Sequence, residues 1–205
     1  MYSPSYNRLE DRAELLAFMR ANNFPVLVTG TGGTLHASHL PVMIGSTEPL
    51  VLDMHMARNN PQWNEFFDDQ EVMVVFSGPH AYVSPRWYED KERVPTWNYA
   101  AVHAYGFPKV LSDPKAKHEN QRRLVAAMDP QWLPEFDKLS EKYVTMMLEG
   151  IVNFEIAVTR VETRWKLSQN RSRREMELIA VQLDKSGDSL EKALGALTRK
   201  HLPKE

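Results

Sequence analysis

The densest group of side chains that could do chemistry lies in VPTWNYAAVHAYG, residues 94–106. Trp97, Asn98 and Tyr99 stand together there, and His103 follows four residues later. Aromatic rings stack or pack edge-on against flat ligands, and amide groups can read the hydrogen-bonding edge of a heterocycle. The mixture does not follow the polar-out, apolar-in pattern of an ordinary surface strand. It predicts a surface for a planar, partly polar ligand, and an aromatic cluster inside a barrel is the alternative interpretation.

A second group lies in HMARNNPQW, residues 55–63, where Arg58, Asn59 and Asn60 precede an expected short helix. Arginine offers a bidentate fork of donors, and the free backbone N–H groups at a helix start add more. This combination suits a phosphate group. The alternative is an ordinary helix cap beside a surface arginine.

A third group lies in WKLSQNR, residues 165–171, at the expected end of a long strand. Lys, Gln, Asn and Arg occur together there, which is an unusual number of donors for a plain turn. They predict contacts to an anion or to ligand carbonyls, with surface solvation as the alternative. The next residues, RSRRE (171–175), place arginines at a helix start, where positive charge opposes the helix dipole and a bound anion would relieve it.

Two other patterns do not predict sites. GTGG (30–33), with Asp53 downstream, resembles a dinucleotide motif, but the helix that such a motif requires does not follow, and Pro41 lies within the next run. A hairpin turn is therefore expected. His36 and His39 lie three residues apart, so on a strand they point to opposite faces and cannot chelate a metal together.

The composition sets limits on the class of protein. The chain has 205 residues, a formal net charge of −2 and no cysteine. One domain over residues 1–205 is expected, and disulfides, thiolate catalysis and cysteine metal sites are excluded. The charge gives no whole-chain reason to bind DNA or an anionic membrane. No signal peptide or membrane segment is predicted, and a cytoplasmic protein is expected.

The elements that must position these groups are mainly strands. Helices are expected from a cap at Asn7 or Asp11 to Asn22, then after Pro61, and over 113–129 and 135–150. Two further helices, separated at Ser186-Gly187, are expected in a helical extension over 171–205. Helices do not separate the early strands, so parallel winding is not expected. The predicted fold is α+β and mainly β: an antiparallel sheet or small barrel with peripheral helices. Strands are predicted at 24–30, 34–44, 48–56, 71–78, 80–85, 94–113 and 151–168.

The motifs VPTWNY, HMARNNPQW and KLSQNR, in this order, resemble the PaiB-type family of FMN-binding negative transcriptional regulators. The opening MYSPSY and the run ASHLPV (37–42) resemble the same family. The resemblance covers nearly the whole chain. It implies an antiparallel split β-barrel of the pyridoxamine-phosphate-oxidase-like type, and a homodimer with FMN between the subunits.

The resemblance also implies roles for particular residues. Arg58 and Asn60 would hold the flavin phosphate, helped by backbone N–H groups around Ala57 and Asn59. The remaining contacts would line the ribityl chain and the ring or close the pocket: Ser38 and His39; Trp97, Asn98 and Tyr99; Lys166, Gln169, Asn170 and Arg171.

The function that the resemblance implies is regulation of transcription by an FMN-binding protein. The sequence shows no clear helix-turn-helix, and a DNA contact, if made, would use Arg171, Arg173 and Arg174 with Lys192, Arg199 and Lys200. A regulatory protein partner is the other possibility. The alternatives are a flavin oxidoreductase, in which His103 or Tyr105 relays protons, a haem-binding split barrel, and a scaffold without cofactor.

Overall fold

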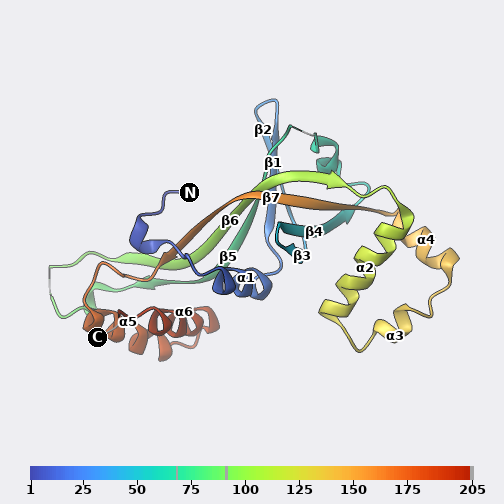
Figure 1. Ribbon diagram of the computed structural model, residues 1–205. Helices are drawn as coiled ribbons and strands as arrows, with labels where there is room; N and C mark the ends of the chain where they lie inside the picture. Colours follow the sequence, from blue (N-terminus) through green and yellow to red (C-terminus); the bar gives the residue numbers. More distant parts are fainter. Residues whose placement is uncertain (68, 91, 204–205) are drawn as a thin grey trace. The chain divides into compact units, whose positions relative to one another are not determined.

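The computed structural model describes residues 1–67, 69–90 and 92–203 (Figure 1). Its centre is one open, seven-stranded antiparallel sheet with the order β2-β1-β5-β6-β7-β4-β3. Neighbours in sequence form hairpins at both edges, and three long strands fill the middle. The strands are β1 (Val26–Thr31), β2 (Thr34–His39), β3 (Val42–Thr47), β4 (Leu50–Ala57), β5 (Val72–Val83), β6 (Thr96–Val110) and β7 (Ile151–Lys166).

Helices precede, interrupt and follow the strands. Five of the α-helices begin at an Asp or Ser whose side chain accepts a hydrogen bond from the first turn, as the capping rules predict. Within the described residues, no helix is both long enough and apolar enough to cross a membrane. The helices are η1 (Ser5–Asn7), α1 (Arg12–Ala21), η2 (Pro61–Glu65), η3 (Pro85–Trp87), α2 (Pro114–Met128), α3 (Leu133–Phe136), α4 (Glu141–Glu149), α5 (Arg173–Asp184) and α6 (Ser189–Lys200).

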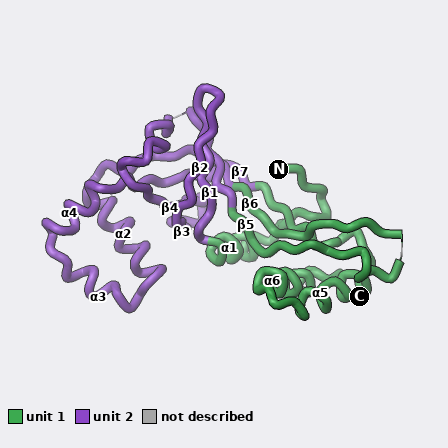
Figure 2. Tube along the Cα trace, turned by 180° about the vertical axis from the view of Figure 1, so that it is seen from behind, with its two compact units in different colours: residues 1–22, 76–103, 162–205 green, residues 23–75, 104–161 purple. Residues whose placement is uncertain are grey.

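The chain divides into two compact units, shown in different colours in Figure 2. Unit 1 contains residues 1–22, 76–103 and 162–205, and unit 2 contains residues 23–75 and 104–161. Both units are discontinuous in sequence because β5, β6 and β7 each contribute residues to both. The expectation of a single domain over residues 1–205 stays a prediction.

Two strand boundaries differ from the sequence-based expectation. The run 34–44, expected as one strand, is two: β2 pairs with β1, and β3 pairs with β4 at the opposite edge. Pro41 lies at the break, because proline has no N–H to donate to a sheet ladder. The runs 71–78 and 80–85, expected as two strands, form the single strand β5, and Gly78-Pro79 does not interrupt it.

Unit 2 has an apolar core built on alternate residues of β4 and β7. Leu52, Met54 and Ile156 are almost completely buried, and the rings of Phe66 and Phe154 pack with centroids 4.7 Å apart. Burying side chains of this size is the main driving force for folding. This core therefore fixes the position of the end of β4. The segment predicted to bind phosphate, Arg58 to Asn60, follows directly after it.

Unit 1 has its own core between the strands and the helices of the C-terminal segment. Trp165 is 1% exposed and packs against Phe18 of α1 with ring centroids 4.7 Å apart. Met176 and Ile179 of α5 are fully buried, as is Leu194 of α6. Residues 171–203 of this segment are therefore a packed part of unit 1, and its two predicted helices are confirmed.

Replacing Gly106 of β6 with alanine is expected to destabilise the protein by about 2 kcal/mol, as overpacking of a rigid site does. A Cβ at this position would overlap the backbone carbonyl of Ala157 and lie 2.9 Å from its carbon, so the clash cannot be relieved by turning a side chain. The measurement is the free energy of urea unfolding.

Gly187→Ala is the matched control, because nothing lies within 4 Å of the added Cβ. This variant should be neutral or slightly stabilising. Equal stability of the two variants would show that β6 does not need a glycine at position 106.

Candidate functional site

The twelve residues predicted to contact a cofactor fall into two groups, one in each unit. Unit 2 contains the first group, which lies on β2, at the end of β4 and just before η2: Ser38, His39, Ala57, Arg58 and Asn60. Unit 1 contains the second, which lies at the start of β6 and around the end of β7: Trp97, Asn98, Tyr99, Lys166, Gln169, Asn170 and Arg171.

In unit 2, Arg58 leaves β4 and contacts the C-terminal end of α4. Its Nε donates to the carbonyl of Glu149 at 2.6 Å, and its Nη2 donates to the carbonyl of Ile151 at 2.9 Å. Its backbone N–H donates to the carbonyl of Gly150 at 2.9 Å. Cations are favoured at this end of a helix, so Arg58 has a structural role that its sequence context did not show. A guanidinium has five donors, and the two used here leave others for a ligand.

Asn60 holds the loop after β4 together. Its Nδ2 donates to Ser38 Oγ at 2.9 Å, and its Oδ1 accepts from the backbone N–H of Gln62 at 3.0 Å. The predicted helix is only a five-residue 3-10 turn, and the N–H groups of Asn60 and Gln62 already have acceptors. Fewer backbone N–H groups are therefore free to bind a phosphate here than the sequence predicted. The structure does bring Ser38 and Asn60 into direct contact.

Gln62 is a buried residue of this loop that sequence reasoning left without a role. Its Nε2 lies 3.2 Å from the carbonyls of Leu27 and His36 and from Thr29 Oγ1, which ties η2 to the β1–β2 hairpin. The available signal was its place inside HMARNNPQW, two residues after Asn60. His39 lies at the end of β2, where its exposed ring stacks on Phe24 at 5.9 Å.

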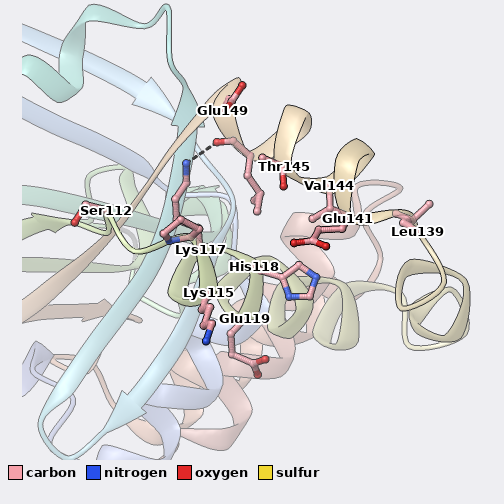
Figure 3. A pocket seen from close by; sticks show the side chains of 12 residues that line it. Ser112, Lys115, Lys117, His118, Glu119, Leu139, Glu141, Val144, Thr145 and Glu149 are labelled. Atoms are coloured by element: carbon pink, nitrogen blue, oxygen red, sulfur yellow. Dashed lines mark hydrogen bonds between the residues drawn. The ribbon is translucent and has the colours of Figure 1, made fainter.

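A cavity of about 700 Å³ lies beside the same helix end, between α2 and α4 (Figure 3). Lys117 of α2 reaches across it and donates from Nζ to the carbonyl of Leu148 at 2.6 Å. Burial lowers the pKa of Lys117, and the neighbouring Arg58 charge lowers it further, while Glu149 opposes the shift. Two cations therefore share the C-terminal end of α4, and the predicted cofactor contacts do not line this cavity.

In unit 1, β6 presents an aromatic face. Asn98, Ala100 and Val102 are buried, whereas Trp97 is 49% exposed and Tyr99 is partly exposed on the opposite side. The strand thus does alternate, contrary to the first impression from its sequence, but both polar and aromatic residues occur on its outer side. His80 and Tyr82 of β5 pack against Trp97, with ring centroids at 5.8 and 6.4 Å.

His103 lies on the outer side of the same strand. Burial lowers its pKa below the ordinary histidine value, the amino-terminal charge lowers it further, and Glu162 opposes the shift. The imidazole is accordingly favoured in its neutral form near pH 7, in which one ring nitrogen donates and the other accepts a hydrogen bond.

Asn98 faces inward and forms a buried pair with Ser168. Asn98 Nδ2 lies 2.9 Å from Ser168 Oγ, and the hydroxyl lies 3.3 Å from Asn98 Oδ1. Ser168 has a φ of 65°, in the left-handed region that non-glycine residues rarely adopt. Such backbone strain persists only where surrounding contacts hold it, and it concentrates at functional sites.

Ser168→Gly is therefore expected to be more stable than Ser168→Ala by about 1 kcal/mol. Both variants lose the hydrogen bonds with Asn98, but only glycine removes the left-handed strain. Urea unfolding of the two variants measures the difference. An alanine variant as stable as the glycine variant would show that residue 168 is not strained.

The predicted residues that follow β7 divide by role. The Lys166 ammonium donates to Thr96 Oγ1 and, at 2.8 Å, to the carbonyl of Trp97, so it ties β7 to the start of β6. The Gln169 side chain folds back onto the carbonyl of Trp165 and the N–H of Leu167, which accounts for both ends of its amide. Asn170 and Arg171 line a pocket together with Lys166.

Arg164 is a residue of this pocket that the sequence analysis missed. It donates to the carbonyl of Tyr2, and its guanidinium lies 5.4 Å from the Tyr2 ring and 5.5 Å from the Tyr99 ring. A signal was present, because Arg164 and Lys166 are two residues apart on a strand and therefore share one face.

The basic residues proposed for DNA contact mostly have partners. Ser172 caps α5 by accepting from the N–H of Glu175, in the sequence pattern of a capping box. Acidic side chains neutralise much of the positive charge that would attract phosphates. The pairs are Arg173–Glu177 at 3.0 Å, Arg174–Glu89 at 3.5 Å, Lys200–Glu14 at 2.9 Å and Arg199–Asp184.

Comparison with known proteins gives a family. Residues 1–160 match the model of the family described as "Putative FMN-binding domain". The chain is 35% identical to the protease synthase and sporulation protein PAI 2 of Bacillus subtilis over 207 residues, covering all of both chains. It is 25% identical to an uncharacterised protein of Emericella nidulans, covering 90% of this chain and 91% of that one.

Solved structures show the same fold at low identity. The FAD and heme binding protein of Mycobacterium smegmatis superposes with a TM-score of 0.62 at 15% identity, covering 78% of this chain and 73% of that chain. A flavocytochrome of Azotobacter vinelandii gives 0.61 at 14% identity, covering 78% and 69%. The predicted fold class, a mainly β split-barrel architecture with peripheral helices, is confirmed, although the sheet is not closed.

Proposed function

The chain belongs to the FMN-binding family that its residues 1–160 match, and from this premise we propose that it binds FMN and acts as a flavin-dependent regulator of the PaiB type. Full-length similarity to PAI 2 carries the proposal. A bound flavin would supply reversible electron acceptance, and the protein would supply binding, orientation and electrostatics.

The residues present fit such a ligand. Arg58 keeps guanidinium donors beyond the two that contact the carbonyls of Glu149 and Ile151, which suits a phosphate. Trp97 and Tyr99 offer partly exposed rings for a planar group. The proposal assigns the phosphate to Arg58 and Asn60, with Ser38, His39 and Ala57 beside them, and the ring to Trp97 and Tyr99. Asn98, predicted for the ring as well, faces inward and holds Ser168. Lys166, Asn170 and Arg171 stay predicted contacts that close the pocket, whereas the amide of Gln169 is already used by its own turn.

The proposal includes a homodimer with FMN at the subunit interface. An aromatic surface formed by His80, Tyr82 and Trp97 supports it, because exposed apolar patches of this kind mark ligand or protein interfaces. Gel filtration of the flavin-loaded protein tests the dimer, and a monomer that retains its flavin would contradict the interface.

The paired charges at α5 and α6 argue against direct DNA contact as the route of regulation. The basic side chains at the start of α5 and the end of α6 are largely paired with carboxylates. A gel shift at low salt, where phosphate contacts are strongest, tests direct binding. A shifted band that weakens on mutation of Arg174 would reverse this preference.

The test of FMN binding is the visible spectrum of the freshly purified protein, with FMN, FAD and riboflavin added in parallel. Oxidised-flavin absorbance that co-elutes with the protein, and is retained better for FMN than for FAD, is the expected result. Addition of NADH and NADPH then tests the oxidoreductase alternative, which requires the flavin to be reduced. Absence of co-eluting flavin under all conditions would overturn the proposal.

A further inference from the structure

The cavity between α2 and α4 lies entirely within unit 2, apart from the residues predicted to contact the flavin, none of which is among its described lining residues. Its volume of about 700 Å³ is typical of a small-molecule site. Leu139, Val144 and Leu148 form an apolar wall on the side of α4. The cavity therefore has room for the apolar body of a small ligand.

Lys117 is the buried ionisable residue of this cavity. It is 9% exposed, and its Nζ donates to a neutral group, the carbonyl of Leu148, at 2.6 Å (Figure 3). Burying an ammonium group favours its neutral form. Burial and the charge of Arg58 both lower the pKa of Lys117, and Glu149 opposes the shift. The neutral amine is therefore easier to form here than on an exposed lysine.

The neutral amine of Lys117 would be suited to attack a carbonyl carbon. Its nitrogen has two N–H donors and one lone pair, and the hydrogen bond to Leu148 uses a donor and leaves the lone pair available. Lysines that are desolvated, or that lie beside another cation, are activated for Schiff-base chemistry. Lys117 has both features, because it is buried and Arg58 is close enough to affect its charge.

The charged side chains around the cavity disfavour an ionic ligand. Glu119, Glu141 and Glu149 contribute carboxylates, and Lys115 lies with Lys117 on the side of α2. A ligand with a net charge of either sign would therefore meet like charges, which lowers its affinity. A neutral ligand with an apolar body and a polar carbonyl end avoids this repulsion and matches both the apolar wall and the amine.

We infer that the cavity is a covalent binding site for small neutral aldehydes and ketones, with Lys117 as the nucleophile. The amine lone pair forms a bond to the carbonyl carbon, and the carbonyl oxygen then leaves as water with the two amine protons, so that an imine remains. His118 and Glu141 extend into the same space from α2 and α4 and can carry these protons (Figure 3). The reaction needs no electron acceptor, so it does not depend on the proposed flavin.

The experiment treats the purified full chain with hexanal and sodium cyanoborohydride, which reduces the imine to a stable secondary amine, and locates the modified lysines by peptide mass spectrometry. Lys142 is the internal control, because it is an exposed lysine of α4 that is not among the lining residues. Lys117 should be modified several-fold faster than Lys142, and its rate should saturate with hexanal because binding precedes reaction. Hexan-1-ol, which lacks a carbonyl, should slow modification of Lys117 and not of Lys142.

Val144→Trp fills the cavity and should lower the rate at Lys117 to that at Lys142, with circular dichroism to show that the variant is folded. Glyoxylate, an aldehyde with a negative charge, tests the ligand class in the wild type without a substitution. The ratio of the Lys117 rate to the Lys142 rate should be lower with glyoxylate than with hexanal. A wild-type Lys117 that reacts no faster than Lys142, a ratio that folded Val144→Trp leaves unchanged, or a higher ratio with glyoxylate would each overturn the inference.

Discussion

Arg58→Ala is expected to weaken FMN binding by about 10- to 150-fold and to leave riboflavin binding nearly unchanged. A charge-assisted hydrogen bond contributes roughly 1.5–3 kcal/mol, and each 1.4 kcal/mol is a factor of ten in affinity. Riboflavin lacks the phosphate, so it cannot lose that contact. Quenching of flavin fluorescence during titration of the flavin-free protein measures both dissociation constants.

The control for this experiment comes from the second role of Arg58. Its guanidinium contacts the carbonyls that end α4, and Lys117 does the same at Leu148. Lys117→Met therefore disturbs the same helix end without removing the proposed phosphate contact, and it should leave FMN affinity unchanged. A similar loss of FMN in both variants would mean that Arg58 acts through α4. Equal weakening of FMN and riboflavin by Arg58→Ala would contradict a phosphate role.

Arg123→Met is expected to lower the free energy of unfolding by about 3 kcal/mol at neutral pH, because it leaves a buried carboxylate without its partner. Asp53 lies on β4 with a side chain only 1% exposed, and its Oδ2 accepts from Arg123 Nη2 at 2.7 Å. Its Oδ1 is buried with no hydrogen-bond partner among the described residues. Chemical unfolding of wild type and variant measures the effect.

The loss should depend on pH with a defined sign. Burial raises the pKa of Asp53 above its ordinary value, and Arg123 partly offsets the shift. A raised acid pKa means that this group's contribution to stability decreases as pH rises from the unfolded value through the folded one. Without Arg123 the folded pKa rises further, so the deficit of the variant should grow as pH rises above the ordinary aspartate pKa of about 4.

The neighbouring residue supplies the matched control. Arg122 pairs with Asp137 at 2.8 Å, but both side chains are about 40% exposed, so solvent screens the pair. Arg122→Met should have a small effect. Asp53→Asn should cost less than Arg123→Met, because the half-exposed Arg123 can turn to water whereas buried Asp53 cannot. A deficit of Arg123→Met that is constant with pH would show that Asp53 is not the group affected.

Local patterns predicted most of the elements in the structure. Asp11 and Asp113 each cap a helix expected to begin there, and such caps depend on residues only two or three positions away. The helix expected over 135–150 is instead two, α3 and α4, and Ser140 caps the second. The long strand over 151–168 was predicted because alternation extends along its length, whereas 94–113 was predicted as a strand although its sequence was not recognised as alternating. The division of 34–44 into β2 and β3 was not predicted. Which edge of a sheet a short strand joins depends on partners distant in sequence.

The sequence predicted which residue types could contact a ligand, but only partly what each residue does in the structure. Arg58 carries the donors that a phosphate needs, yet its contacts to the end of α4 depend on residues 91 and 93 positions away. Gln169 was proposed as a ligand donor, but its amide is used by the turn that contains it. Arg164 was missed because its importance comes from its neighbours in space, Tyr2 and Tyr99.

By itself, the amino-acid order determined the caps, the strand periodicity, the absence of cysteine chemistry and the motifs that pointed to a flavin-binding family. These properties depend on short-range geometry or on residue identity alone. Only the tertiary structure decided which hydrogen-bond donors remain available and which charged side chains are buried beside an oppositely charged partner. Hydrogen bonding and desolvation depend on atoms brought together from distant parts of the chain, and no local pattern contains that information.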